Sequence, residues 1–274
     1  MHWYTGNAFY DTVLTAAFAF AAFVIIGGFF AQSSYGRFSS TKLGLNLNPK
    51  LGWWLMELPA TVVFLICYLA GPHRFEPASL VLAGIWMLHY ANRGWFFPLA
   101  IRQVPGKRGT FNVSVIVMGM LVTSMHGYLN GTLFSHDFFG QYTTAWLTDP
   151  RFLVGLVVYL CGFALLVNSE SIVRNLREKG SPGASASGLR ACGSSSEYRI
   201  PYGGGFRFVT SPAYLGELIA WSGFALLTWA LPGVVILLIT AGNLIPRALG
   251  THTWYLEKFP EYPTDRKALI PYVW

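Results

Sequence analysis

The sequence predicts an all-α protein, a single membrane-embedded domain over residues 1–274 built as a bundle of seven transmembrane helices. Of its 274 residues, 53% are hydrophobic and only 11% are charged, whereas a soluble domain carries about 25% charged residues. Seven mostly apolar segments approach the roughly 20 residues that a helix needs to cross a bilayer. The expected spans are 8–31, 51–71, 77–101, 112–130, 152–168, 212–231 and 233–244.

Serine, proline and glycine mark the ends of the last two spans. Ser211 followed by Pro212 is typical of an N-cap and the first residue of a helix. The sequence Leu231-Pro232-Gly233 cannot continue a helix without a kink, so it predicts a tight turn. The last span is short, and Pro246 lies at its expected boundary. Small residues that allow close helix packing occur at Gly216, Ala220 and Gly223.

The basic residues predict how the chain is oriented in the membrane. Most Lys and Arg residues fall in the connections after the first, third and fifth spans and in the tail, whereas the opposite connections hold only Arg74 and Arg151. Since positive loops face the cytoplasm, we expect the N-terminus outside and the C-terminus inside. Positive loops also explain the net charge of +7 without a nucleic-acid partner. Residues 179–197, rich in Gly, Ser and Ala, predict a flexible cytoplasmic loop.

The sequence predicts neither a cleaved signal peptide nor a metal site. The N-terminus lacks a basic stretch before its first apolar run, so the sequence indicates no cleaved signal peptide. The three cysteines, Cys67, Cys161 and Cys192, have no metal-ligand spacing. We therefore interpret the cysteines as packing residues and expect no bound metal.

Ionisable side chains inside the predicted spans are the strongest functional signal. Glu57 lies in the second span, Tyr90 and Arg93 in the third, and Glu217 in the sixth. Charged groups in lipid cost several kcal/mol unless they are paired or functional. One interpretation is structural, with Glu57 or Glu217 pairing with Arg93 to hold the bundle together. A proton relay in a transporter is another.

Glu57 and Tyr90 also suit a reaction that places negative charge on a carbonyl oxygen. A hydride added to the β-carbon of an enone creates such a charge, and each positioned hydrogen-bond donor lowers that barrier by roughly 2.7–4 kcal/mol. The Tyr90 hydroxyl can donate, and Glu57 can donate when it carries a proton, the form that burial in lipid favours. The two groups could therefore hold one oxygen between them.

A basic stretch around the flexible loop predicts a site for a phosphorylated ligand. Glu170, Arg174 and Arg177 precede the loop, and Tyr198 and Arg199 follow it, just before Gly203-Gly204-Gly205. Arginines make bidentate contacts with phosphates, and glycines let backbone amides approach them. An ordinary positive cytoplasmic loop is the alternative. No Rossmann or P-loop motif occurs, so a nucleotide would bind within the helical bundle.

Ordered motifs along the chain resemble those of the steroid 5α-reductases. They are Glu57-Leu-Pro, Leu88-His-Tyr90 with Arg93, Tyr198-Arg-Ile-Pro, Tyr214-Leu-Gly-Glu217, Asn243-Leu-Ile-Pro-Arg247, His252-Thr-Trp-Tyr255 and Arg266-Lys-Ala-Leu-Ile-Pro. The resemblance extends from about residue 55 to the C-terminus and is strongest over 198–274. The sequence departs from the family at Met56, Glu170 and Ala213, where Gln, Asp and Asn are usual.

The resemblance implies a seven-helix reductase that uses NADPH to reduce the Δ4 double bond of a 3-oxosteroid. It places Glu57 and Tyr90 at the 3-oxo oxygen. It places Arg177, Tyr198, Arg199, Glu217 and Tyr255 at the cofactor, with Arg93, Arg102, Arg247 and His252 nearby. Glu170, Arg174 and Asn243 complete the candidate cofactor-binding set. The expected partners are a steroid-like lipid enone and the membrane lipid.

Three other functions remain open at this point. A reductase of polyprenols or of another enone or enoyl lipid would share the cofactor site. Membrane methyltransferases of the isoprenylcysteine type resemble the same C-terminal region but use S-adenosylmethionine. A transporter or lipid-binding protein would use Glu57, Arg93 and Glu217 as a gating or structural network.

Overall fold

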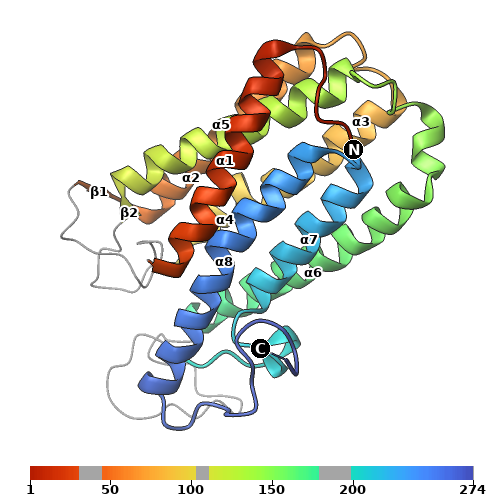
Figure 1. The fold of residues 1–274 in the computed structure, drawn as a ribbon. Coiled ribbons are helices and arrows are strands. Elements are labelled where there is room, and N and C mark those ends of the chain that lie inside the picture. The colour runs from red at the N-terminus through yellow and green to blue at the C-terminus, as the bar shows by residue number, and fades with distance from the viewer. Residues whose placement is uncertain (31–44, 103–110, 179–198, 274) are drawn as a thin grey trace.

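The computed structural model describes residues 1–30, 45–102, 111–178 and 199–273, and they form a helical bundle (Figure 1). The long helices are α1 (Ala8–Phe30), α2 (Pro49–Ala70), α3 (Pro77–Tyr90), α5 (Val113–His136), α6 (Pro150–Glu178), α7 (Pro212–Thr228) and α8 (Leu231–Lys258). A π-helix (Ala91–Phe96) joins α3 to the short α4 (Phe97–Ala100), and two short 3₁₀-helices cover Thr144–Thr148 and Gly204–Arg207. The predicted all-α class is confirmed for these residues.

Five of the described helices, α1, α2, α5, α6 and α8, are long and apolar enough to cross a membrane. The other two expected spans differ in a physical way. Helix α7 has only 17 residues, and the third expected span is divided between α3, the π-helix and α4. The fold is therefore that of a membrane-embedded helical protein, and the full count of seven spans stays a prediction.

The end of the last span and the turn before it were predicted wrongly. Helix α8 continues for 28 residues to Lys258, with Pro246 in its interior. A proline removes one helical hydrogen bond, but the flanking turns can hold the helix together. The turn between α7 and α8 falls at Trp229 and Ala230, and Pro232 lies in the first turn of α8, where a missing N–H costs nothing. Helix α6 likewise extends to Glu178 rather than ending near 168.

Helices α6 and α7 pack at glycine contacts. A Cβ on Gly162 would lie 2.3 Å from the Ala220 nitrogen, and one on Gly155 would lie 2.4 Å from the Leu227 nitrogen. Viewed from α7, Gly216 and Gly223 approach the same stretch of α6 just as closely. Since lipid offers no hydrophobic drive, such close backbone packing holds membrane helices together. The expected role of Gly216 and Gly223 is confirmed.

A two-stranded ribbon fixes the starts of α2 and α5. Strand β1 (Asn46–Leu47) pairs antiparallel with β2 (Phe111–Asn112). The Asn48 side chain accepts from the backbone nitrogen of Lys50 at 2.9 Å and caps α2. The Asn112 side chain accepts from the backbone nitrogen of Ser114 at 2.8 Å and caps α5. Asparagine is a preferred N-cap because it satisfies a free helix N–H. The two helices therefore start side by side, and the hydrogen bonds from Thr123 to Met56 and from Ser135 to Cys67 show that they run parallel.

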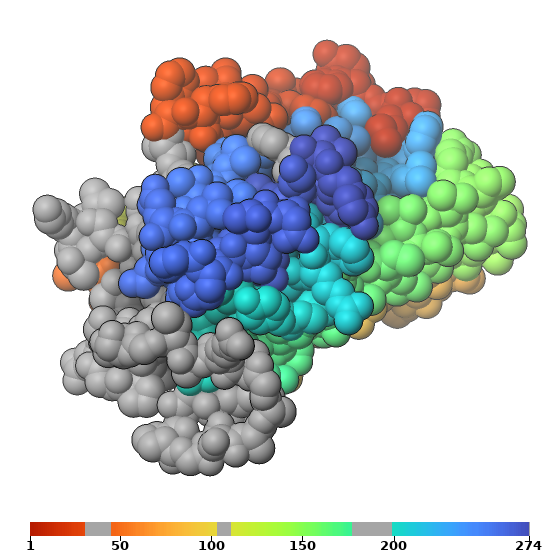
Figure 2. Space-filling view, turned by 90° about the horizontal axis from the view of Figure 1, so that it is seen from below, coloured from red at the N-terminus to blue at the C-terminus, as the bar shows by residue number. Residues whose placement is uncertain are grey.

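The connections divide between two ends of the bundle. The basic end, where α1, α6 and α8 finish, carries Lys50, Arg102, Arg174, Arg199, Arg207, Lys258, Arg266 and Lys267 among the described residues, while Arg74 and Arg151 lie at the opposite end. Figure 2 looks at the basic end and shows the segment 199–211 beside the C-terminal tail, residues 259–273. The nitrogens of Thr210 and Ser211 donate to the tail oxygens of Lys267 and Ala268 at 2.7 and 3.2 Å. The tail thus fixes the segment that leads into α7.

Candidate active site

The largest described cavity lies inside the bundle and measures about 490 Å³. Ligand cavities usually occupy about 300–1,000 Å³. Its walls come from α1, α2, α3 with the π-helix, α5, α7 and α8, and include Phe20, Trp53, Met56, Glu57, Tyr90, Arg93, Met118, Thr123, His126, Glu217, Trp221, Ile236, Thr240 and Asn243. We call this space the large cavity.

One arginine joins two carboxylates on the wall of the large cavity. Arg93 Nε donates to Glu57 Oε1 at 3.1 Å, and Arg93 Nη1 lies 2.8 Å from Glu217 Oε1. Both glutamates are buried, and the guanidinium lies over the Trp53 ring at 5.5 Å. The pairing expected from the sequence is confirmed, and Arg93 binds both partners rather than one. The cluster ties α2 and α7 to the π-helix.

The charge balance of this cluster leaves room for one proton. With both carboxylates ionised, Glu57, Arg93 and Glu217 would together carry one net negative charge inside the bundle. A proton on one of the carboxylates makes the cluster neutral, and a neutral cluster is much cheaper to bury. The arrangement can therefore serve both to hold the helices and to hold a proton.

Tyr90 lines the same cavity as Glu57, as the sequence predicted. Its ring is held between Trp86 at 4.7 Å and Trp221 at 6.3 Å. Trp86 Nε1 donates to the Ala60 oxygen at 2.9 Å, which ties α3 to the helix that carries Glu57. His89 does not line the cavity and instead packs against Trp221 at 4.2 Å. The π-helix that follows changes the helical register, and such insertions often occur at functional sites.

A second, small cavity of about 250 Å³ lies at the basic end, and four of the predicted cofactor-binding residues line it: Arg102, Glu170, Arg174 and Tyr255. Glu170 accepts from Asn92 Nδ2 at 3.2 Å, and Arg174 lies over the Phe96 ring at 5.2 Å. The N-terminus of α7 also faces this space, and Ser211 Oγ there is buried and has no hydrogen-bond partner in the part of the chain that the structure describes. We call this space the small cavity.

The length of α8 places three candidate residues, together with Thr251, on one helix face between the two cavities. Asn243 lines the large cavity, and Thr251 and Tyr255 line the small one. Arg247 lies between them, buried, and its Nε donates to the Tyr214 hydroxyl at 2.9 Å. The four are spaced by four residues, so they follow one stripe of the helix. The stripe exists only because α8 continues past Pro246.

The remaining candidates lie elsewhere. His252 lines neither cavity, but its Nδ1 lies 2.6 Å from Oγ1 of Thr210, which lines the small one. Arg199 is exposed and lines neither cavity. Arg177 lies in the last turn of α6, but its side chain is outside the described residues, as is all of Tyr198.

Residues of the C-terminal tail contact Thr210, which lines the small cavity, and so hold that part of its wall in place. Thr210 Oγ1 lies 2.7 Å from the Tyr262 hydroxyl. Burial raises the pKa of Tyr262, while hydrogen bonds with Thr210 and Arg266 act in the opposite direction. The Arg266 guanidinium is buried over the Tyr262 ring at 5.0 Å, and its Nη1 donates to the Pro201 oxygen at 3.2 Å. No pattern in the sequence indicated a role for Thr210 or Tyr262.

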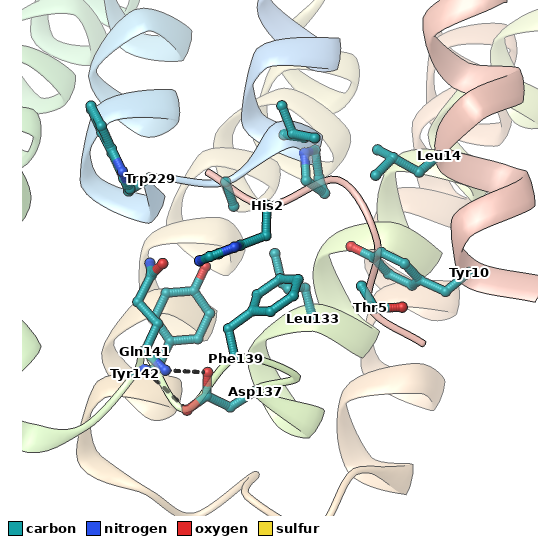
Figure 3. Close-up of a pocket in the computed structure, with 13 residues that line it drawn as sticks. His2, Thr5, Tyr10, Leu14, Leu133, Asp137, Phe139, Gln141, Tyr142 and Trp229 are labelled. Carbon is teal, nitrogen blue, oxygen red and sulfur yellow. Dashed lines mark hydrogen bonds between the residues drawn. The ribbon is translucent and has the colours of Figure 1, made fainter. Parts of the chain in front are cut away.

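A third pocket, at the opposite end, is too small to be a substrate site. It measures about 10 Å³ and lies between the N-terminal segment and the loop after α5 (Figure 3). The Asp137 carboxylate accepts there from the backbone nitrogens of Gln141 and Tyr142 at 2.9 and 3.0 Å. A volume of this size holds about one water molecule. The two cavities around Arg93 and Arg174 are therefore the candidate site.

Comparison with known proteins identifies the family. The family model for 3-oxo-5-alpha-steroid 4-dehydrogenase matches residues 109–274. The chain belongs to this family. It is 38% identical to 3-oxo-5-alpha-steroid 4-dehydrogenase 1 of Mus musculus, over 93% of this chain and 92% of the mouse protein. It is 34% identical to steroid 5-alpha-reductase DET2 of Gossypium hirsutum, over 90% of each chain, and 32% identical to the Homo sapiens 3-oxo-5-alpha-steroid 4-dehydrogenase 1, over 88% and 86%.

Membership of the 3-oxo-5-alpha-steroid 4-dehydrogenase family confirms the resemblance found in the sequence. The matched region includes the whole of α5 to α8, and thus Glu217, the small cavity wall from Glu170 onward and the α8 stripe. The pairwise alignments cover about nine-tenths of the chain. The transporter and methyltransferase interpretations therefore lose their support. No group of side chains suited to a metal ion occurs among the described residues.

Proposed function

We propose that this protein uses NADPH to reduce the Δ4 carbon–carbon double bond of a 3-oxosteroid, giving a 5α-reduced product. One observation carries the proposal: Glu57 and Tyr90 line a single cavity of about 490 Å³ in a chain of the 3-oxo-5-alpha-steroid 4-dehydrogenase family. The many apolar side chains of the wall suit a steroid skeleton, and Glu57 and Tyr90 suit its 3-oxo oxygen.

Tyr90 and Glu57 stabilise the charge that develops on the substrate. NADPH, when bound, supplies a hydride for C5 of the enone. The 3-oxo oxygen then becomes negative, and it accepts hydrogen bonds from the Tyr90 hydroxyl and from the protonated Glu57 carboxyl. Glu217 balances the charge of Arg93, so that Glu57 can keep its proton without an uncompensated charge. A proton taken up at C4 completes the saturated ketone.

The small cavity and the α8 stripe suit a dinucleotide. Arg102 and Arg174 offer charge-assisted hydrogen bonds to phosphates. Ser211 Oγ, buried without a partner at the N-terminus of α7, is a donor suited to the same kind of group. The path from the small cavity to the large cavity passes Arg247, Asn243 and Glu217. The residues present therefore fit the phosphates at the basic end and the nicotinamide near Glu57.

The membrane arrangement follows from the charge asymmetry of the two ends. We infer seven spans, with α7 and the segment from α3 to α4 as the two that composition alone does not identify. The basic end faces the cytoplasm and the N-terminus lies outside. The cofactor cavity then opens toward the compartment that holds NADPH.

The function is tested with the purified protein in detergent, NADPH and a panel of lipids: a 4-en-3-oxosteroid, an enoyl thioester and a polyprenol. We expect loss of NADPH absorbance with the steroid only, and a 5α-reduced product by mass spectrometry. Glu57→Leu should reduce the rate by about 10²–10³-fold, the typical effect of removing one oxyanion donor. Glu257→Leu, at an exposed position on α8, is the matched control. Near wild-type turnover by Glu57→Leu would remove Glu57 from the mechanism.

The cofactor assignment has its own test. Arg102→Gln and Arg174→Gln should raise the KM for NADPH more than the KM for NADH, because NADH lacks the 2′-phosphate. The control is Arg207→Gln, which changes an exposed arginine at the same end of the bundle. Equal KM changes for both cofactors would show that these arginines do not read that phosphate. Thermal stabilisation by S-adenosylmethionine instead of NADPH would contradict the cofactor itself.

A further inference from the structure

A histidine on the wall of the large cavity has a buried ring nitrogen that finds no hydrogen-bond partner among the described residues. His126 on α5 is 5% exposed, and its Nε2 is buried without a hydrogen-bond partner. Among the described residues that line the large cavity, His126 is the one with such an atom. Buried polar atoms are nearly always hydrogen-bonded, and an unsatisfied one destabilises the fold. The atom therefore calls for a ligand or a water molecule.

His126 lies deeper in the bundle than the arginine–glutamate cluster. Helices α2 and α5 run parallel, and Thr123 Oγ1 donates to the Met56 oxygen at 2.8 Å, so Thr123 lies level with Glu57. Gly127 approaches the Pro59 oxygen and the Phe64 nitrogen. The rise of about 1.5 Å per residue places His126 almost one turn beyond Thr123, toward the opposite end. The histidine and the Glu57–Tyr90 pair therefore line different parts of one cavity.

The other groups near His126 do not compete for this role. The cavity wall carries the apolar Phe20, Val122 and Ile236, and its Thr240 hydroxyl, unlike His126 Nε2, is not among the buried atoms that lack a partner in the described part of the chain. Thr123 already donates to the Met56 oxygen. His89 shares the burial of His126 but does not line the cavity. A polar group on a ligand that filled the cavity would find His126 as its natural partner there.

We propose that His126 hydrogen-bonds a second oxygen of the substrate, remote from the 3-oxo group, and so selects oxygenated steroids. The inference rests on the proposed function, because it takes the 3-oxo group to be held by Glu57 and Tyr90. An imidazole can donate to a keto group or accept from a hydroxyl, so it serves either oxygen. A site built to hydrogen-bond an oxygen rejects the analogue that lacks it, because its own polar atom stays unpaired.

The test compares two 4-en-3-oxosteroids that differ only at C17, where one carries a hydroxyl and the other carries hydrogen. For the wild-type protein with NADPH, kcat/KM should favour the hydroxylated steroid by about tenfold, the value of one neutral hydrogen bond. His126→Leu should bring this ratio close to one by raising KM for the hydroxylated steroid. His126→Gln, which keeps a donor and an acceptor, should retain most of the preference.

Controls separate this inference from the proposed function. His73→Leu, at an exposed position between α2 and α3, should leave the ratio unchanged. A ratio that His126→Leu does not alter, or a wild-type ratio near one, would mean that a buried water satisfies Nε2 and would overturn the inference alone. Failure of the wild-type protein to reduce either steroid would overturn the proposed function as well.

Discussion

Replacing Gly162 by alanine tests whether the α6–α7 contact sets the geometry of the site. A Cβ at this position would lie 2.3 Å from the Ala220 nitrogen and 2.6 Å from the Gly216 oxygen. Both contacts are backbone atoms, so no side chain can rotate away. An ordinary contact at this position needs about 3.4 Å, so the two helices must separate by about 1 Å (3.4 − 2.3).

Two effects of different size follow from this displacement. Overpacking of this kind costs about 1–3 kcal/mol of folding free energy, which lowers Tm by several degrees. Helix α6 carries Glu170 and Arg174, and α7 carries Glu217, so the same displacement misplaces groups of both cavities. Since a misplacement of 1 Å can reduce the rate by about 10²-fold, activity should fall far more than stability.

The assay combines thermal unfolding followed by tryptophan fluorescence with NADPH oxidation, both in detergent. The matched control is Gly84→Ala on α3, where a Cβ would meet nothing within 4 Å. That change should raise Tm slightly, because alanine favours a helix over glycine. A Gly162→Ala protein with the Tm and the activity of the control would refute the close backbone contact.

Three further predictions address the site and its support. Tyr90→Phe should lower kcat by about 10²–10³-fold with Tm almost unchanged, and a wild-type kcat in the NADPH assay would exclude the hydroxyl from the chemistry. Arg93→Met leaves the buried Glu217 carboxylate without its cation and should destabilise the fold by about 3–5 kcal/mol; adding Glu217→Gln should recover part of the Tm, and no recovery would contradict the charge balance. Arg266→Met removes the guanidinium behind Tyr262 and should raise the KM for NADPH more than it changes kcat, whereas an unchanged KM would separate the tail from the cofactor cavity.

The positions of the helices were predictable because apolar runs are long, but several of their ends were not. Helices α6 and α8 continue beyond their apolar segments to Glu178 and Lys258. Polar residues at the basic end do not stop these helices, because packing against neighbouring elements stabilises the helical backbone hydrogen bonds there. Pro246 was interpreted as a boundary because proline usually ends a helix, and the neighbouring α1 at Gly28 covers that position instead.

Part of the site was predictable because burying a charged side chain in an apolar helix costs free energy and is therefore rare. Glu57, Arg93 and Glu217 are conspicuous because charges are rare in apolar spans, and the structure places them in direct contact. His126 and Ser211 could not be found in this way. A histidine or a serine is an ordinary residue in sequence, and only the rotation of its helix decides whether it faces a cavity. The roles of Thr210 and Tyr262 depend on the tail returning to α7, which no local pattern indicates.

The glycine contacts also explain why a large cavity can exist inside a tightly packed bundle. Helices α6 and α7 approach at Gly162, α2 and α5 at Gly127, and α1 and α8 at Gly242, in each case with a backbone atom 2.3–3.0 Å from the Cβ that glycine lacks. Each pair therefore behaves as one rigid wall, and the large cavity lies where the three walls meet. Rigid walls hold Glu57 and Glu217 at fixed positions around Arg93, so the proposed donor Glu57 is already in place before a substrate binds. Catalysis in this protein thus depends on helix contacts that never touch the substrate.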